Sequence, residues 1–358
     1  MNKSLVPILI AALAAWAAPA DAAVKASDVI DRAIDGFVRP AYATFHEEAA
    51  SADKAVAALC KAPSQANLDA ARAGFADLVK AWSQAEIIQF GPITEDNRLE
   101  RILYWPDRKS IGLKQVQAAI ADEDKTATDA ATLRAKSVAM QGLGALEYIL
   151  HGTGADDLAG KSGAYRCAFG AAVAGNIDNI AMQVDAEWAK PDGFAKLWNN
   201  PGPDNPVYRD GTESVTELME VFINGLEMVR DVRVKGFLGD KPDGDKPKGS
   251  IFWRSGLTGA SLAGNLEGMD RLFETSHVGD ALSGDAHWMA DSTHILLANG
   301  VADARSVTGP IDKALEDPDQ RAKFEHFRLV TSSLSSLIGT RMSAEFGLTT
   351  GFSSLDGD

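Results

Sequence analysis

Apolar residues recur three or four positions apart through most of this chain, and this spacing restricts the fold more than any other feature. Between positions 64 and 82 they are Leu68, Ala71, Phe75, Leu78 and Trp82, with charged residues on the other faces. This pattern is typical of a helix that buries one side in a bundle. No stretch shows the strict alternation of apolar and polar residues that indicates a strand. The sequence therefore predicts an all-α fold.

Several helix ends can also be predicted. Ser27 is a candidate cap for a first helix, and Pro40 is expected to kink or restart that helix. The residues Ser214 to Glu217 form a capping box that opens another helix. A long helix from about Pro318 is expected to stop at Gly347.

One predicted helix, over residues 133–150, contains two glycines. Gly142 and Gly144 each cost about 1 kcal/mol in a helix relative to alanine. Such a cost suggests that another helix, or a ligand, approaches this helix closely.

A change of composition divides the chain. Residues 191–211 are rich in Pro, Gly, Asn and Asp, which is the strongest boundary signal in the sequence. We expect an N-terminal helical bundle over 23–190, a linker over 191–211 and a C-terminal helical bundle over 212–358, packed side by side. Both halves place a long helix and a loop before a segment with Trp and Arg, which suggests an internal duplication.

The first 22 residues have the pattern of a cleaved secretory signal. A basic start precedes an apolar run from Leu5 to Ala18, and the A-x-A site Ala20-Asp21-Ala22 follows. A transmembrane anchor is the alternative, but the run is shorter than the ~20 residues that span a bilayer. We expect cleavage near Ala22, no transmembrane anchor after it, and a periplasmic protein.

Charge restricts the partners of the chain. The formal net charge is −15, and loss of residues 1–22 leaves it unchanged because that segment holds one cation, Lys3, and one anion, Asp21. An acidic surface repels phosphate backbones. We therefore expect no nucleic-acid partner.

The chain has two cysteines, Cys60 and Cys167. An even count in an exported protein favours one disulfide, with two buried free thiols as the alternative. Neither cysteine lies in a recognisable nucleophile signature.

The segment between Phe90 and Gly112 carries candidate binding residues. Arg98 and Arg101 lie three positions apart on a predicted turn, where they are suited to bind an anion or a carboxylate such as that of Glu147. Solvated arginines are the alternative. Tyr104 and Trp105 follow directly, and they favour a structured cleft.

The segment around Glu147 links the chain to a known family. The sequence GLGALEYILH, from Gly142 to His151, resembles the G-x-H-x-x-E signature that the imelysin family carries on a helix. Other segments that resemble imelysin-like proteins, in the same order, are FGP, Asn97-Arg98, Tyr104-Trp105-Pro106-Asp107, Trp253-Arg254-Ser255-Gly256 and the terminal GFSSLDGD. The resemblance implies a periplasmic protein involved in iron acquisition.

This sequence departs from the signature at one position, because Gly144 stands where the family has histidine. In the family pattern His and Glu share one helical face, a spacing that suits a metal ion or an acid–base pair. The peptidase activity associated with the family therefore loses its main support here. His151, one turn after Glu147, is the candidate replacement ligand, for iron or another divalent metal; a surface hydrogen bond between the two is the alternative. The other histidines, His46, His277, His287, His294 and His326, show no ligand spacing.

The resemblance also implies that the segments around Arg98 and Arg254 converge at the interface between the two bundles. Glu147 is expected there as an acceptor for a ligand, or as a partner of Arg98, Arg101 or Arg254. The candidate ligand-binding residues are Asn97, Arg98, Arg101, Tyr104, Trp105, Asp107, Gly142, Gly144, Glu147, Arg254 and Ser255.

Three functions remain as hypotheses. The first is a periplasmic imelysin-like binding or accessory protein, connected with iron acquisition and with iron-uptake components of the cell envelope, which binds a ligand or partner at the interdomain cleft. The alternative is a metal-dependent peptidase with Glu147 as base or ligand. The third is a purely structural or partner-docking protein whose polar junction is a network of salt bridges. The sequence identifies no catalytic residue, so binding is favoured over catalysis.

Overall fold

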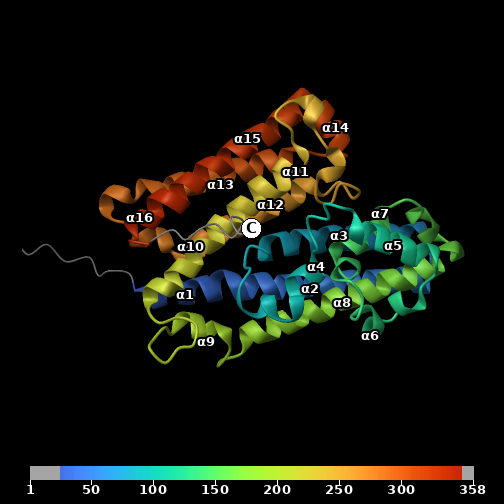
Figure 1. The fold of residues 1–358 in the computed structure, drawn as a ribbon, viewed down its shortest axis with the longest axis horizontal. Helices are drawn as coiled ribbons and strands as arrows, with labels where there is room; N and C mark the ends of the chain where they lie inside the picture. Colours follow the sequence, from blue (N-terminus) through green and yellow to red (C-terminus); the bar gives the residue numbers. More distant parts are fainter. Residues whose placement is uncertain (1–24, 349–358) are drawn as a thin grey trace, which may run out of the picture.

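The computed structural model describes residues 25–348, and its elements are helices joined by turns (Figure 1). No strand occurs in this part of the chain, so the predicted all-α fold is confirmed. The longer helices are α1 (Ala26–Ala33), α2 (Arg39–Lys61), α3 (Gln65–Ala85), α5 (Ile111–Ala121), α7 (Leu143–His151), α8 (Ala164–Ala189), α10 (Gly211–Glu227), α12 (Thr258–Ser276), α13 (Trp288–Ser306) and α15 (Pro318–Leu334). The short ones are α4 (Arg98–Ile102), α6 (Ala130–Leu133), α9 (Phe194–Asn199), α11 (Lys235–Phe237), α14 (Ile311–Glu316) and α16 (Ser343–Glu345). The predicted signal and the terminal GFSSLDGD lie outside the described residues.

Wider, π-helical turns join α1 to α2, α10 to α11, and α15 to α16, at Ile34–Val38, Met228–Val234 and Ser335–Met342. The first of them lies directly before Pro40, which has no N–H to donate within a helix. The break expected at Pro40 takes this form, and the helix continues to Lys61. Ser27 is not a cap, because α1 already begins at Ala26.

The start of α10 also differs from the prediction. Asp210 caps this helix, since its Oδ1 accepts hydrogen bonds from the backbone N–H groups of Thr212 (2.9 Å) and Glu213 (3.1 Å). The capping box predicted at Ser214 is therefore wrong. Ser214 lies inside the helix and donates its hydroxyl to the carbonyl oxygen of Trp198 (2.8 Å).

The helix predicted over 133–150 is interrupted. After α6 ends at Leu133, α7 begins only at Leu143, with Gly142 in the extended cap position. A Cβ atom on Gly142 would lie 2.2 Å from the carbonyl oxygen of Ile102, so no side chain fits there. The close approach that the glycines suggested is thus made by α4, at Gly142. Farther along, the helical stop predicted at Gly347 is confirmed by its φ of +66°.

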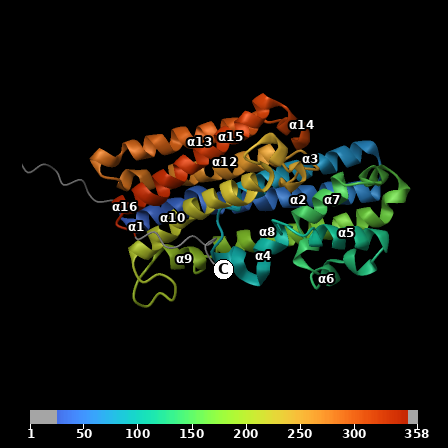
Figure 2. The same cartoon turned by 45° about the horizontal axis from the view of Figure 1, so that its top comes forward.

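The helices form two groups that lie side by side along the length of the molecule (Figures 1 and 2). In the N-terminal helix group, α2 packs on α3 and α8; in the C-terminal helix group, α13 packs on α12 and α15. The groups meet where α3 packs on α12, while α1 packs on α10 and α12. The continuous N-terminal stretch of α1 and α2 therefore contacts both groups, and the division into bundles 23–190 and 212–358, like the duplication, stays a prediction.

The predicted linker is packed rather than open. Its Trp198, on α9, is fully buried, and the indole N–H donates to the carbonyl oxygen of Ser214 (3.0 Å). The ring of Trp198 lies 4.8 Å from that of Phe90, centroid to centroid, and further ring contacts join Trp188, Phe194 and Tyr208. Residues 191–211 are thereby fixed against the N-terminal helix group.

The predicted disulfide is present. Cys60, at the end of α2, is bonded to Cys167, near the start of α8, with 5.4 Å between their Cα atoms. The bond ties together two long helices through cysteines that are 107 residues apart in sequence.

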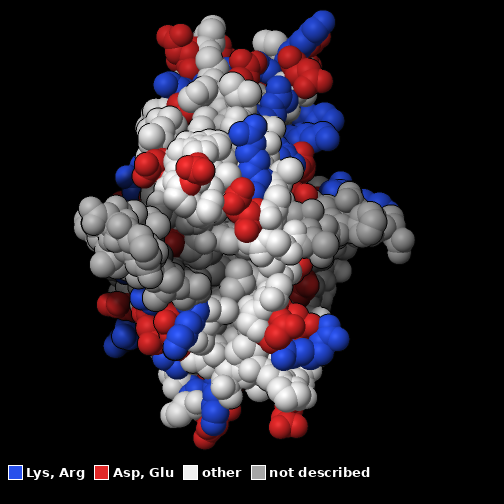
Figure 3. Space-filling view, turned by 90° about the vertical axis from the view of Figure 1, so that its left-hand side faces the viewer, with Lys and Arg blue, Asp and Glu red and all other residues white. Residues whose placement is uncertain are grey.

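The surface of the described part is of mixed charge. On the end of the molecule at the left of Figure 1, acidic and basic side chains are interspersed around an uncharged centre (Figure 3). Among helices of residues 25–348, none is both long enough and apolar enough to cross a membrane.

Candidate functional site

The last turn of α7 is held by two arginines from neighbouring helices. Arg166, on α8, donates to the carbonyl oxygens of Tyr148 (2.6 Å) and Ile149 (2.8 Å), and Arg72, on α3, donates to that of Leu150 (2.9 Å). The last carbonyls of a helix have no partner within the helix, so these bonds satisfy them. The end of α7 is therefore fixed in position relative to α3 and α8.

Glu147, on α7, joins the two helix groups. The residue is 4% exposed, and its Oε1 accepts hydrogen bonds from the N–H groups of Arg254 (3.1 Å) and Ser255 (3.0 Å) and from the Ser255 hydroxyl (2.8 Å). Its Oε2 lies 3.9 Å from the Arg254 guanidinium. Burial raises the pKa of Glu147, while the donors on Ser255 and Arg254 act in the opposite direction. Of the three predicted partners of this carboxylate, the structure brings only Arg254 to it.

The turn that Glu147 binds has an unusual backbone. Phe252 has a φ of +52° and Gly256 a φ of +72°, in the left-handed region that a bulky residue such as Phe rarely adopts. The buried carboxylate stabilises this conformation by accepting the N–H groups of Arg254 and Ser255, two of the three residues between them. As a result, Trp253 and Arg254 lie together, with the guanidinium carbon 4.3 Å from the centre of the indole.

Trp253 and Arg254 line a cleft of about 800 Å³ between the helix groups, which we call the Trp253 cleft. The basic residues on its wall are Arg72, Lys246, Lys248 and Arg254, and the acidic ones are Asp156 and Asp312. Lys248 also lies over the indole of Trp253, with its Nζ 5.8 Å from the ring centre. Cations thus outnumber anions locally, although the protein as a whole is acidic. Such a cleft favours an anionic ligand with a flat or apolar part.

His151, at the end of α7, also lines the Trp253 cleft. Its ring packs on Phe75, with 5.7 Å between ring centres, and within the described structure its buried Nε2 has no hydrogen-bond partner. Burial and, secondarily, the nearby Arg72 lower the pKa of His151 to about 4. The imidazole is therefore neutral at pH 7.

This low pKa predicts a loss of stability in mild acid. In the unfolded chain the histidine binds its proton near pH 6.5, whereas in the folded protein it does so only near pH 4. The stabilisation that comes from keeping His151 neutral is therefore complete above pH 6.5 and is lost as the pH falls to 4. We expect a loss of about 2 kcal/mol, less than for a wholly buried ring because part of His151 is exposed. Denaturant unfolding at pH 7.0 and 4.5 should show a smaller loss for His151→Gln than for wild type. The matched variant His277→Gln, at an exposed histidine, should behave as wild type; equal losses in all three proteins would contradict the assignment.

The residues of the motif do not by themselves form a metal site in the described structure. Gly144 is exposed, and a Cβ atom there would meet open space, so the family's histidine would be accommodated. Glu147 turns its Oε1 to Arg254 and Ser255, whereas His151 lines the Trp253 cleft. Over residues 25–348, no group of three or more His, Cys, Asp and Glu is placed to hold a metal ion. A metal role for Glu147 and His151 stays a prediction, and it would need ligands from the bound molecule itself.

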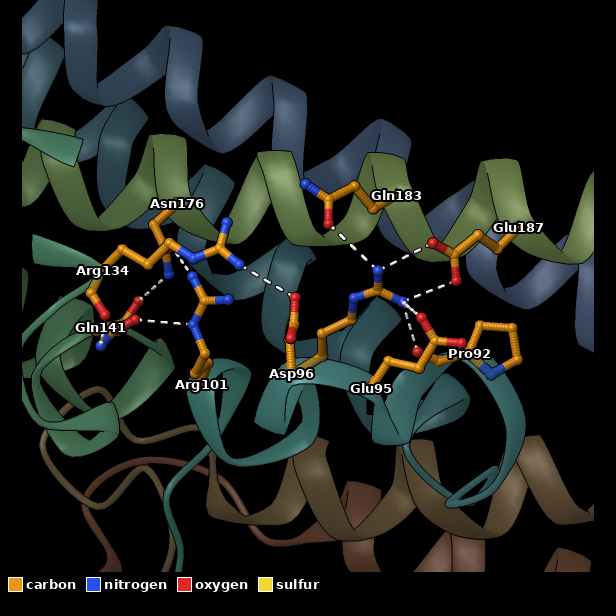
Figure 4. A network of polar contacts seen from close by, with 10 residues as sticks. Pro92, Glu95, Asp96, Arg101, Arg134, Gln141, Asn176, Gln183 and Glu187 are labelled. Atoms are coloured by element: carbon orange, nitrogen blue, oxygen red, sulfur yellow. Dashed lines mark hydrogen bonds and ion pairs between the residues drawn. The ribbon is translucent and has the colours of Figure 1, made fainter. Parts of the chain in front are cut away.

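Arg98 and Arg101 bind side chains of the neighbouring helix α8, in a network of polar contacts (Figure 4). Arg98 donates to both carboxylate oxygens of Glu187 (2.8 and 2.9 Å) and to the carbonyl oxygen of Pro92 (2.6 Å). Arg101 donates to Oε1 of Gln141 (2.9 Å) and Oδ1 of Asn176 (2.7 Å). Both side chains are buried, so these bonds fix the segment 91–102 on the N-terminal helix group.

The other predicted residues of this segment are dispersed. Asn97 is exposed, and Asp107 accepts the N–H groups of Ile111 (2.7 Å) and Leu113 (3.1 Å) at the start of α5, which is a capping role. Tyr104 and Trp105 line a separate cavity, which is described further below. The predicted site is therefore split: His151 and Arg254 line the Trp253 cleft, and Glu147 binds the turn that carries Arg254 and Ser255.

One buried cluster joins the helix groups through residues that the sequence did not single out. Arg233 donates to Oε2 of Glu86 and to Oδ1 of Asn265, both at 2.5 Å, and joins α3 to the C-terminal helix group. Glu86 and Arg233 are 3% and 2% exposed. The available signal was a lone carboxylate next to Ile87 and Ile88 at the end of an apolar helix, since such a buried charge requires a partner. Trp253 and Lys248 were likewise not predicted as cleft residues.

Comparison with known proteins agrees with this fold. The chain is similar to the crystal structure of an imelysin-like protein from Psychrobacter arcticum 273-4, with a TM-score of 0.75 and 19% identity over 92% of this chain and 98% of the other. It is also similar to a structure from Parabacteroides distasonis ATCC 8503, described as a candidate iron-regulated protein A precursor, with a TM-score of 0.69 and 13% identity over 89% and 98% of the two chains. No curated protein sequence matches. The model of the imelysin family (peptidase M75) matches residues 38–337, which is most of the chain. The chain therefore belongs to the imelysin family.

Proposed function

We propose that this protein is an exported binding protein connected with iron acquisition, and that it holds an anionic iron chelate in the Trp253 cleft. The observation that carries the proposal is the bond between Glu147 and the 252–256 turn. A buried carboxylate of the N-terminal helix group accepts three donors from the C-terminal group and so positions Trp253 and Arg254 together. In this role Glu147 orients the binding residues and does not itself take up the ligand.

The chemistry of the cleft wall supports an anion. Arg254 is suited to bind a carboxylate through two N–H groups, and Lys248 adds a second cation beside the same indole. His151, which is neutral, lines the same cleft, and its buried Nε2 has no hydrogen-bond partner in residues 25–348, so it is a candidate hydrogen-bonding group for a ligand that reaches it.

The connection with iron rests on relatives. One structural neighbour is described as iron-regulated, and the family resemblance implies iron acquisition. Ferric ion bound by carboxylates forms an anionic complex, which combines iron with the charge that the cleft favours. Export is proposed from the signal-like pattern of the first 22 residues. Partners among the iron-uptake components of the cell envelope are proposed from the family resemblance.

The test is calorimetric titration with ferric citrate and, separately, with iron-free citrate. Wild type is expected to bind ferric citrate, and Arg254→Gln is expected to weaken binding about tenfold or more, because it removes one charge-assisted contact. The control is Arg341→Gln. Arg341 also lies over a tryptophan, Trp288, but outside the cleft, so its loss should change nothing.

The outcomes separate the hypotheses. Equal binding by wild type and Arg254→Gln would overturn the assignment of the cleft. Tighter binding of citrate than of ferric citrate would remove the connection with iron while leaving an anion site. Peptide hydrolysis that is abolished by a chelator and by Glu147→Ala would instead establish the metal-dependent peptidase.

A further inference from the structure

A second cavity, of about 420 Å³, lies between the helix groups. Its walls come from α3 and α4 on one side and from α10 and the π-helical turn Met228–Val234 on the other. Leu99, Leu103, Met228 and Val232 supply apolar surface, and Tyr104, which is 39% exposed, lies on its wall. We call it the Trp105 pocket. None of its lining residues belongs to the Trp253 cleft.

Three lining residues carry buried donors without an acceptor. Neither Nε1 of Trp82 and Trp105 nor Nε of Arg233 has a hydrogen-bond partner in residues 25–348. Trp82 is fully buried and Arg233 is 2% exposed. A buried donor that lacks an acceptor costs about 1–3 kcal/mol. Three such donors on the lining residues of one cavity favour a ligand that carries an acceptor oxygen.

The charge of Arg233 is already balanced. Its guanidinium binds Glu86 and Asn265, and Nδ2 of Asn265 donates to the other oxygen of Glu86 (2.8 Å). A ligand carboxylate in the pocket would therefore lie near Glu86, and Arg233 would not be free to pair with it. Burying such an unpaired negative charge is unfavourable. Glu100 and Arg108, farther along the wall, have opposite charges. The acceptor is thus expected to be neutral.

We propose that the Trp105 pocket is a second binding site, for a small neutral molecule that carries an amide or other carbonyl oxygen next to an apolar group. The oxygen accepts from the indole N–H of Trp105 and the donors near it, and the apolar group packs on Leu103 and Met228. This site is independent of the Trp253 cleft and does not depend on its proposed function.

The test uses N-acetyl-phenylalaninamide as the probe, and its free acid, N-acetyl-phenylalanine, as the partner that differs by one charge. Indole N–H signals in ¹H–¹⁵N NMR spectra report binding. The amide is expected to shift the signals of Trp82 and Trp105, and the acid to bind at least about tenfold more weakly. Trp105→Phe keeps an aromatic ring but removes one donor, so it should weaken amide binding about fivefold.

The matched control is Trp288→Phe, at a tryptophan that is 46% exposed and outside the pocket, and it should bind the amide as wild type does. The proposal is overturned if millimolar amide leaves the Trp82 and Trp105 signals unchanged. It is also overturned if the acid binds as tightly as the amide, or if Trp105→Phe binds as tightly as wild type.

Discussion

Replacing Arg233 with methionine is expected to lower the free energy of unfolding by about 4 kcal/mol. The substitution leaves the carboxylate of Glu86, which is 3% exposed, with Asn265 as its remaining side-chain partner. An uncompensated buried charge is among the most destabilising single changes that a protein can undergo. Denaturant unfolding followed by circular dichroism would measure the effect.

A double variant distinguishes the cause. Glu86→Leu together with Arg233→Met removes both charges, so it should be less destabilised than Arg233→Met alone. If the double variant loses as much stability as Glu86→Leu and Arg233→Met lose together, the pair is not coupled in the way that the 2.5 Å contact indicates.

Removal of the disulfide is the second large effect. Replacing Cys60 and Cys167 with alanine should lower the free energy of unfolding by about 4 kcal/mol, because the bond closes a loop of 107 residues in the unfolded chain. The comparison is the denaturant midpoint of the double variant with that of wild type, each with and without a reducing agent.

Reductant should destabilise wild type and leave the double variant unchanged. Equal denaturant midpoints for wild type and the double variant, both without reductant, would contradict the prediction. Two free thiols, counted in denatured wild type without reductant, would contradict the bond itself.

Local pattern was sufficient to predict the helices that bury one regular face. The stripe from Leu68 to Trp82 predicted α3, which runs from Gln65 to Ala85. The pattern was insufficient for the first residue of α10, which has two candidate caps. Both Asp210 and Ser214 precede a glutamate by three residues, as a capping residue does in a capping box. The buried bond between Ser214 and Trp198, a tertiary contact, accompanies the start at Asp210.

The site was predictable in its residues but not in its pairing. Glu147 was expected to meet Arg98, Arg101 or Arg254, and their sequence environments do not distinguish them. In the structure Arg98 binds Glu187, and Arg101 binds Gln141 and Asn176, because α4 lies against α8. Of the three, only Arg254 contacts the Glu147 carboxylate, and that contact depends on how the helix groups pack. The Glu86 and Arg233 pair was missed for the same reason.

The most direct measurement of the central proposal is an NMR titration that follows the indole N–H signals as ferric citrate is added. Ferric iron is paramagnetic and broadens signals close to it, so the signal assigned to Trp253 with a Trp253→Phe variant should broaden first. The signals of Trp105 and Trp288, which lie outside the Trp253 cleft, should broaden only at much higher concentration. Uniform broadening of all indole signals, or loss of the Trp105 signal before that of Trp253, would contradict binding of an iron chelate in this cleft.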